Sequence, residues 1–198
     1  MKSTPLKITL LALPLSAYGH HPMGGETPET TIQGLLSGLG HPIVEMDHFI
    51  FVVGFAYLLA VCSRHILSHI GLFLGLAILG TVGRLLFPEI SFFEAGVFVT
   101  TVLVGVLLII QRLDHDRLLW ILSPVAGLFH GYGYGGAVVG AENTPLFAYL
   151  LGFSLIQAVL MLGTIGGVKR LAGDRLAVAL SGYRSISGAV LIGLAFIV

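Results

Sequence analysis

Long apolar runs alternate with short polar connections along most of this chain. The runs cover residues of about 43 to 62, 66 to 87, 91 to 111, 117 to 137, 145 to 168 and 176 to 197. Each run is close to the roughly 20 residues that an α-helix needs to cross a bilayer, and none alternates like a barrel strand. The pattern therefore predicts an all-α fold, a polytopic helical membrane protein with about six transmembrane helices.

A shorter apolar run opens the sequence. Lys2 and Lys7 precede the run 8–15, and small residues follow it at 16–19, which is the order typical of a secretory signal peptide. We expect this segment to be cleaved. The expected parts of the chain are a signal peptide, a periplasmic N-terminal segment and a six-helix transmembrane domain, over residues 1–19, 20–42 and 43–198.

Positive charges predict how the helices are oriented. Basic residues gather in alternate connections, at Arg64, Arg112, Arg117, Lys169, Arg170 and Arg175. Connections rich in Lys and Arg stay in the cytoplasm. We therefore expect a protein of the bacterial inner membrane whose N- and C-termini are both periplasmic.

The composition agrees with lipid as the solvent. Hydrophobic residues make up 56% of the chain, charged residues 10%, and the mean hydropathy is +0.96, far from the values of soluble domains. The formal net charge is zero, so no global field predicts a nucleic-acid partner. The expected partners are the lipid bilayer and, as open alternatives, further copies of the chain or a metallochaperone.

The start of the first long run holds an unusual group of polar residues. In a helix, His41, Glu45 and His48 share one face at i, i+4 and i+7, and Asp47 lies one step around it. Pro42 suits the first turn of a helix. One interpretation is a capped helix start, because carboxylates are favoured near a helix N-terminus. We favour a metal or proton site, because ionisable residues inside membrane spans are usually functional.

The fourth run contains a glycine-rich segment, 127–136, with His130 in its middle. Such glycine density predicts a broken helix, and broken helices at membrane depth can form ion sites. The orientation places His130 at the same outer half as His48. The alternative for His130 is a buried histidine bonded to a neighbouring carbonyl.

Three further features are candidates around this outer half. Glu94, at the outer start of the third run, could bind a metal or could pair with Arg84. Cleavage after residue 19 would join a free amine and an imidazole at His20-His21, which together chelate late first-row metals. Glu142 lies in an outer connection and either guards an opening or is only solvated.

The opposite end also has polar residues. The histidines there are His65, His69 and His115, and they accompany Arg64, Asp114, Asp116 and Arg117. A metal exit site and an ordinary charged cytoplasmic connection are the two interpretations. Three tyrosines, Tyr132, Tyr134 and Tyr149, could belong to an interfacial aromatic belt rather than to a site.

Two of these motifs resemble the signatures of a known family. His41, five intervening residues and Asp47-His48 resemble the first signature of the HupE/UreJ family of nickel permeases. Phe129-His130-Gly131 resembles the second, written F-H-G-x-A-x-G-x-E. The chain departs from that pattern, because it has Gly133 in place of Ala and Ala137 in place of Glu. Whether Glu142 replaces the missing carboxylate is left open.

The resemblance implies a secondary permease that takes up Ni²⁺, with His41, Asp47, His48 and His130 along the metal pathway. Co²⁺, Zn²⁺ and copper are the alternative ions, because imidazole and carboxylate suit all of them. The alternative function is a periplasm-facing protein that binds copper or delivers metal without transporting it. It is favoured by His20-His21, Met23 and Met46. We do not expect an enzyme, because the sequence has neither a nucleophile beside a base nor an H-E-x-x-H motif.

Overall fold

The computed structural model describes residues 26–87, 89–110, 115–173 and 176–198. These residues form seven α-helices and one 3-10 helix, and no strand is found among them, so the predicted all-α fold is confirmed. The helices are α1 Thr31–Val44, α2 Met46–Cys62, α3 Ile66–Leu86, α4 Ser91–Ile109, α5 His115–Gly135, η1 Gly136–Val138, α6 Asn143–Ala172 and α7 Leu176–Ala195. The predicted signal peptide and the His20-His21 pair lie outside the described residues.

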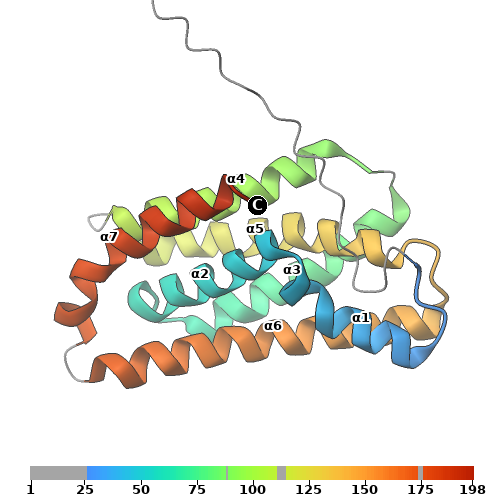
Figure 1. Ribbon diagram of the computed structural model, residues 1–198, viewed down its shortest axis with the longest axis horizontal. Helices are drawn as coiled ribbons and strands as arrows, with labels where there is room; N and C mark the ends of the chain where they lie inside the picture. The colour runs from blue at the N-terminus through green and yellow to red at the C-terminus, as the bar shows by residue number, and fades with distance from the viewer. Residues whose placement is uncertain (1–25, 88, 111–114, 174–175) are drawn as a thin grey trace, which may run out of the picture.

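The long helices run along the long axis of one bundle. In Figure 1, α4 and α7 lie along one side, α6 lies along the opposite side with α1, and the remaining long helices lie between them. The closest pairs are α3 with α5, α1 with α6, and α4 with α7. The bundle therefore consists of three helix pairs with α2 among them.

Length and apolarity decide which helices can cross a bilayer. Within the described residues, α3, α4 and α6 are each long and apolar enough, and α1 and α2 pass together as one bent pair. Helices α5 and α7 would complete the six predicted spans. The chain is thus a polytopic helical protein, and the number of six spans stays a prediction.

Helix α1 was not predicted from hydropathy. It begins with a capping box, in which the Gln33 amide donates to the Thr30 hydroxyl at 3.2 Å and the Thr30 amide donates to the Gln33 side chain at 3.0 Å. It packs on α6 through glycines, because a β-carbon at Gly34 or Gly38 would overlap the α6 backbone. Small residues allow such close approach in membrane helices, but they give no apolar signal.

The helix is interrupted at Glu45, between α1 and α2. Glu45 has extended backbone angles, φ −82° and ψ 104°, and the two helices are bent by 74° at this point. Pro42 lies in the last turn of α1, so its expected place in the first turn of a span is wrong. Proline has no N–H and crowds the preceding turn of a helix. The expected single helix over 43–62 is therefore two helices that meet at Glu45.

The break that we expected within the glycine-rich segment 127–136 is wrong, because the helix is not broken there. Helix α5 continues through this segment to Gly135, and only η1 departs from α-helical geometry. The reason is packing, because a β-carbon at Gly127 or Gly131 would overlap the backbone of α3. The carbonyl of Gly131 also accepts a hydrogen bond from the Thr81 hydroxyl at 2.9 Å. These glycines bring α5 against α3 and do not unwind it.

Candidate metal centre

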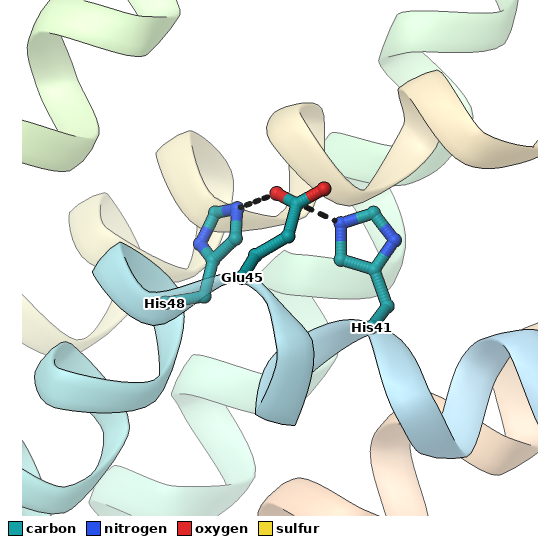
Figure 2. Close-up of side chains that lie close together, drawn as sticks. All are labelled: His41, Glu45 and His48. Atoms are coloured by element: carbon teal, nitrogen blue, oxygen red, sulfur yellow. Dashed lines mark ion pairs between the residues drawn. The ribbon is translucent and has the colours of Figure 1, made fainter. Parts of the chain in front are cut away.

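Three potential ligands meet where the chain breaks. His41 comes from the last turn of α1, Glu45 from the break and His48 from the first turn of α2. Figure 2 shows the Glu45 carboxylate between the two imidazole rings, and its Oε2 lies 3.2 Å from His41 Nε2 and 3.6 Å from His48 Nε2. The ligand atoms all lie within 4.8 Å of one another. With metal–ligand bonds of about 2.0–2.2 Å, a slight closure of this group would enclose one ion.

A hydrogen bond with the hydroxyl of Tyr149 fixes the tautomer of His41. The tautomer decides whether the ring nitrogen that faces Glu45 carries a proton. The Tyr149 hydroxyl donates its proton to the carbonyl of Tyr134 at 2.7 Å. Its oxygen also lies 3.1 Å from His41 Nδ1, so Nδ1 must be the protonated nitrogen that donates to it. The unprotonated Nε2 of His41 is therefore directed at the carboxylate.

A longer series of hydrogen bonds, through Thr100 and His130, fixes the tautomer of His48. The Thr100 hydroxyl donates to the Gly96 carbonyl at 2.8 Å and accepts from His130 Nε2 at 3.2 Å. His130 Nδ1 is then unprotonated and accepts from His48 Nδ1 at 2.8 Å. The unprotonated Nε2 of His48 therefore also faces Glu45.

The two relays give the cluster the character of a cation site. Two neutral imidazole nitrogens and one carboxylate direct their lone pairs at the same small space. Such groups repel one another unless a cation or a proton lies between them. Second hydrogen bonds that fix the tautomer are what metal-binding histidines usually have, and this donor set suits Ni²⁺, Co²⁺, Zn²⁺ or Cu²⁺. In this structure, His130 positions His48 and does not itself face Glu45.

Buried polar and aromatic side chains enclose the cluster. Tyr132, Tyr134 and Tyr149 are all buried, so the interfacial belt considered for them is wrong. The Tyr134 ring packs on His48 at 4.3 Å between centroids, and its hydroxyl donates to the side chain of Gln157 at 3.1 Å. Gln157 was missed, although a polar residue inside the apolar run 145–168 is the signal that could have found it.

Asp47 and Glu94 lie beside the cluster rather than in it. Asp47 accepts a hydrogen bond from the amide of His48 at 2.7 Å. Together with Glu94 it lines a cleft of about 200 Å³ between α2, α4 and the end of α7. The expected alternative partner of Glu94 was Arg84, but Arg84 pairs with Glu89 at 3.2 Å. Glu94 is exposed in this cleft.

The structure shows what surrounds Gly133 and Ala137, the two residues that differ from the family pattern. A β-carbon at Gly133 would lie 3.2 Å from His48 Nε2, so glycine leaves room beside a ligand atom. Ala137 is buried in η1 among a cluster that includes Tyr134 and Tyr149. Glu142 lines a separate acidic cavity with Glu26 and Glu29. A carboxylate lost at position 137 is thus not replaced within the His41 cluster by Glu142.

The Thr100 relay gives a specific prediction. Thr100→Val removes the hydroxyl that fixes His130 and, through it, His48, so we expect the affinity for a divalent metal to fall by about 10-fold or more. Isothermal titration of the purified protein measures this. Thr101→Val is the matched control, because Thr101 is also buried on α4 and, within the part of the chain that the structure describes, its hydroxyl donates to the Val97 carbonyl and has no hydrogen bond with His130. Equal affinities of the two variants would contradict the relay.

Comparisons with known proteins agree on one family. A sequence model of the family described as HupE / UreJ protein matches residues 8–197. "Protein HupE" of Rhizobium leguminosarum bv. viciae is 26% identical over 204 residues, an alignment that covers 95% of this chain and 100% of that protein. No solved structure matches this chain.

Proposed function

The chain belongs to the HupE / UreJ family, and from this premise we propose that it is a secondary permease that takes up a divalent transition metal, with Ni²⁺ as the first candidate. The family consists of membrane transporters, not enzymes, and is associated with nickel and cobalt uptake. The observation that supports the proposal most is the His41, Glu45 and His48 cluster at a helix break. We propose that transport is across the bacterial inner membrane, with this cluster on the periplasmic half of the pathway.

The broken helix pair suits permeation better than permanent storage. Half-helices that meet inside a bundle form ion sites in transporters, since the break supplies ligands and can rearrange. Glu45 is the hinge as well as a ligand, so a change in the 74° bend would move the carboxylate away from one imidazole. Binding and release of the ion are thereby coupled to the angle between α1 and α2.

Asp47 and Glu94 provide the acidic approach to this cluster. Both line the cleft near the N-terminal ends of α2 and α4, and Asp47 is the chain neighbour of the ligand His48. Two carboxylates at an opening raise the local concentration of cations. We propose that the ion passes from this cleft to the imidazoles.

The donor set favours Ni²⁺ and Co²⁺ over Cu⁺. Among the described residues the cluster contains imidazole and carboxylate groups and no sulfur, whereas Cu⁺ prefers thiolate and thioether ligands. Met46, which favoured copper in the sequence, is half exposed and is not part of the cluster. These observations weaken the case for a copper-binding protein. Metal delivery without transport stays the second candidate, and an absence of influx would favour it.

Purified protein in liposomes tests the proposal. The vesicles contain a metal-sensitive dye and are given Ni²⁺, Co²⁺, Zn²⁺ or Cu²⁺ separately, with protein-free vesicles as the control. We expect saturable influx of Ni²⁺, Co²⁺ or both. Tight binding of these ions with no influx above that of the control would contradict a permease and favour a metal-delivery protein.

A further inference from the structure

A second group of potential ligands lies at the other end of the bundle, where α3 and α5 begin. His65 precedes α3, His69 lies in its first turns, and Asp116 lies in the first turn of α5. His65 Nε2 is 3.8 Å from Asp116 Oδ2, and His69 Nε2 is 3.9 Å from Asp116 Oδ1. Figure 1 places this end away from η1 and the loop that leads into α6.

The tautomer of His69 is fixed in the same way as those of His41 and His48. The Ser123 hydroxyl donates to the Leu119 carbonyl, and its oxygen lies 3.0 Å from His69 Nδ1. Nδ1 is therefore the protonated nitrogen and donates to Ser123. Nε2 is left as the acceptor, and it is fully buried with no hydrogen-bond partner among the described residues.

The carboxylate of Asp116 is held in place opposite this nitrogen. The Ser63 hydroxyl and the Arg64 amide each donate to Asp116 Oδ1 at 3.3 Å. The distances of 3.8 and 3.9 Å from the carboxylate to the two imidazoles are too long for hydrogen bonds. Each imidazole is thus within reach of an ion that it shares with Asp116 at about 2.0–2.2 Å from each ligand, although these three residues are less closely grouped than the His41 cluster, whose ligand atoms all lie within 4.8 Å of one another.

We propose that His65, His69 and Asp116 form a second binding site for a divalent transition metal ion. A buried lone pair that faces a carboxylate is unfavourable unless a cation lies between them, and two imidazoles with one carboxylate repeat the donor set of the His41 cluster. His65 is half exposed and Asp116 is partly exposed, so the site opens to solvent at this end. The proposal that a metal ion binds here does not depend on transport. If the protein is the proposed permease, this site is where the ion is released, and that part alone rests on the proposed function.

The chain contains a built-in probe of this site. Trp120 is the only tryptophan of the protein, and its ring lies 4.7 Å from the His69 ring and 5.8 Å from the His65 ring. Paramagnetic ions such as Co²⁺ quench tryptophan fluorescence at short range. Fluorescence of Trp120 therefore reports occupancy of this second site.

The test is a Co²⁺ titration of purified full-length protein with both His41→Gln and His48→Gln, which removes the two imidazoles of the first site. We expect saturable quenching of Trp120 with one bound Co²⁺ per chain by equilibrium dialysis. Adding Asp116→Asn or His65→Ala should abolish both the saturable quenching and the bound ion. These two residues are accessible, and Asn keeps an oxygen that can accept from Ser63 and Arg64, so both variants are expected to fold.

The matched control is His115→Gln, because His115 is a buried histidine at the same end whose Nε2 lies 2.8 Å from the Leu107 carbonyl. This variant should keep the quenching and the bound ion. Quenching that does not saturate, or that survives Asp116→Asn, would overturn the second site and leave a proton between His69 and Asp116 as the explanation of the geometry. Neither result depends on influx, so a failure of the permease proposal would be separate.

Discussion

Replacing His48 with glutamine is expected to reduce metal influx into liposomes by about 100-fold or more. His48 supplies one of the two imidazole nitrogens that face Glu45, and it is also the end of the relay from Thr100 through His130. Loss of a supporting hydrogen bond to a ligand costs about 10- to 100-fold in affinity, and loss of the ligand itself should cost at least as much. Glutamine keeps the size and polarity of the side chain but is a poor metal ligand.

The control for this variant is His115→Gln, which makes the same change at a buried histidine that faces the Leu107 carbonyl. Both proteins are reconstituted at equal density, checked for helix content and given the same Ni²⁺ gradient. We expect influx near that of the unaltered protein for His115→Gln. Influx of the same size through His48→Gln would show that the ion does not pass His48.

Gly131→Val is expected to give the largest loss of stability. A β-carbon at Gly131 would overlap the backbone of Ala77, so α5 would have to move away from α3 along their main contact. Overpacking that forces backbone to shift typically costs about 1–3 kcal/mol, and we expect the upper end of this range because the overlap is with backbone atoms. The carbonyl of Gly131 would also lose its hydrogen bond from Thr81. Thermal unfolding in detergent, followed by circular dichroism, measures the effect.

Gly71→Val is the matched control, because a β-carbon at Gly71 meets nothing within 4 Å. Both substitutions replace a helical glycine with the same β-branched residue and so share the same small change in helix propensity. The difference in unfolding temperature therefore isolates the contact between α3 and α5. Similar unfolding temperatures would show that the two helices are not in close contact at Gly131.

Hydropathy predicted the long apolar helices, but it did not predict α1, which has no long apolar run. The runs expected at 66–87 and 91–111 became α3 and α4 almost residue for residue. Helix α1 was missed because its glycines pack on α6 and give no apolar run. Such a helix is stabilised by contacts with its neighbours, which local sequence does not contain.

Helix propensity also misplaced the break. Both Pro42 and the glycines of 127–136 are helix breakers in water, and the glycines were the larger signal. In this bundle Gly127 and Gly131 are used for close packing on α3, while the chain breaks just after Pro42, at Glu45. Whether a glycine packs or unwinds depends on what faces it, and that is decided by tertiary structure.

The grouping of His41, Glu45 and His48 survived the break for a physical reason. The amide of Glu45 still donates to the His41 carbonyl at 3.1 Å, and the Glu45 carbonyl accepts from Phe49 at 3.0 Å. Helical spacing is therefore kept on each side of Glu45, and both imidazoles stay next to it. The spacing in the sequence was enough to bring these three together.

The supporting residues could not be predicted in the same way. Thr100 is 30 residues from His130, and Tyr149 is 108 residues from His41. Their contacts depend on the register between α4 and α5 and between α1 and α6, for which a single helix pattern has no information. The sequence marked His130 as a metal-pathway residue, but only the structure gives the order of its hydrogen bonds.

X-ray absorption spectroscopy of bound Ni²⁺ tests the central claim most directly. The protein would contain Asp116→Asn to remove the proposed second site and would be compared with the same protein that also contains His41→Gln. We predict nitrogen and oxygen ligands with the scattering of two imidazoles, and one imidazole after His41→Gln. A sulfur ligand, or a spectrum that His41→Gln leaves unchanged, would contradict a site formed by His41, Glu45 and His48.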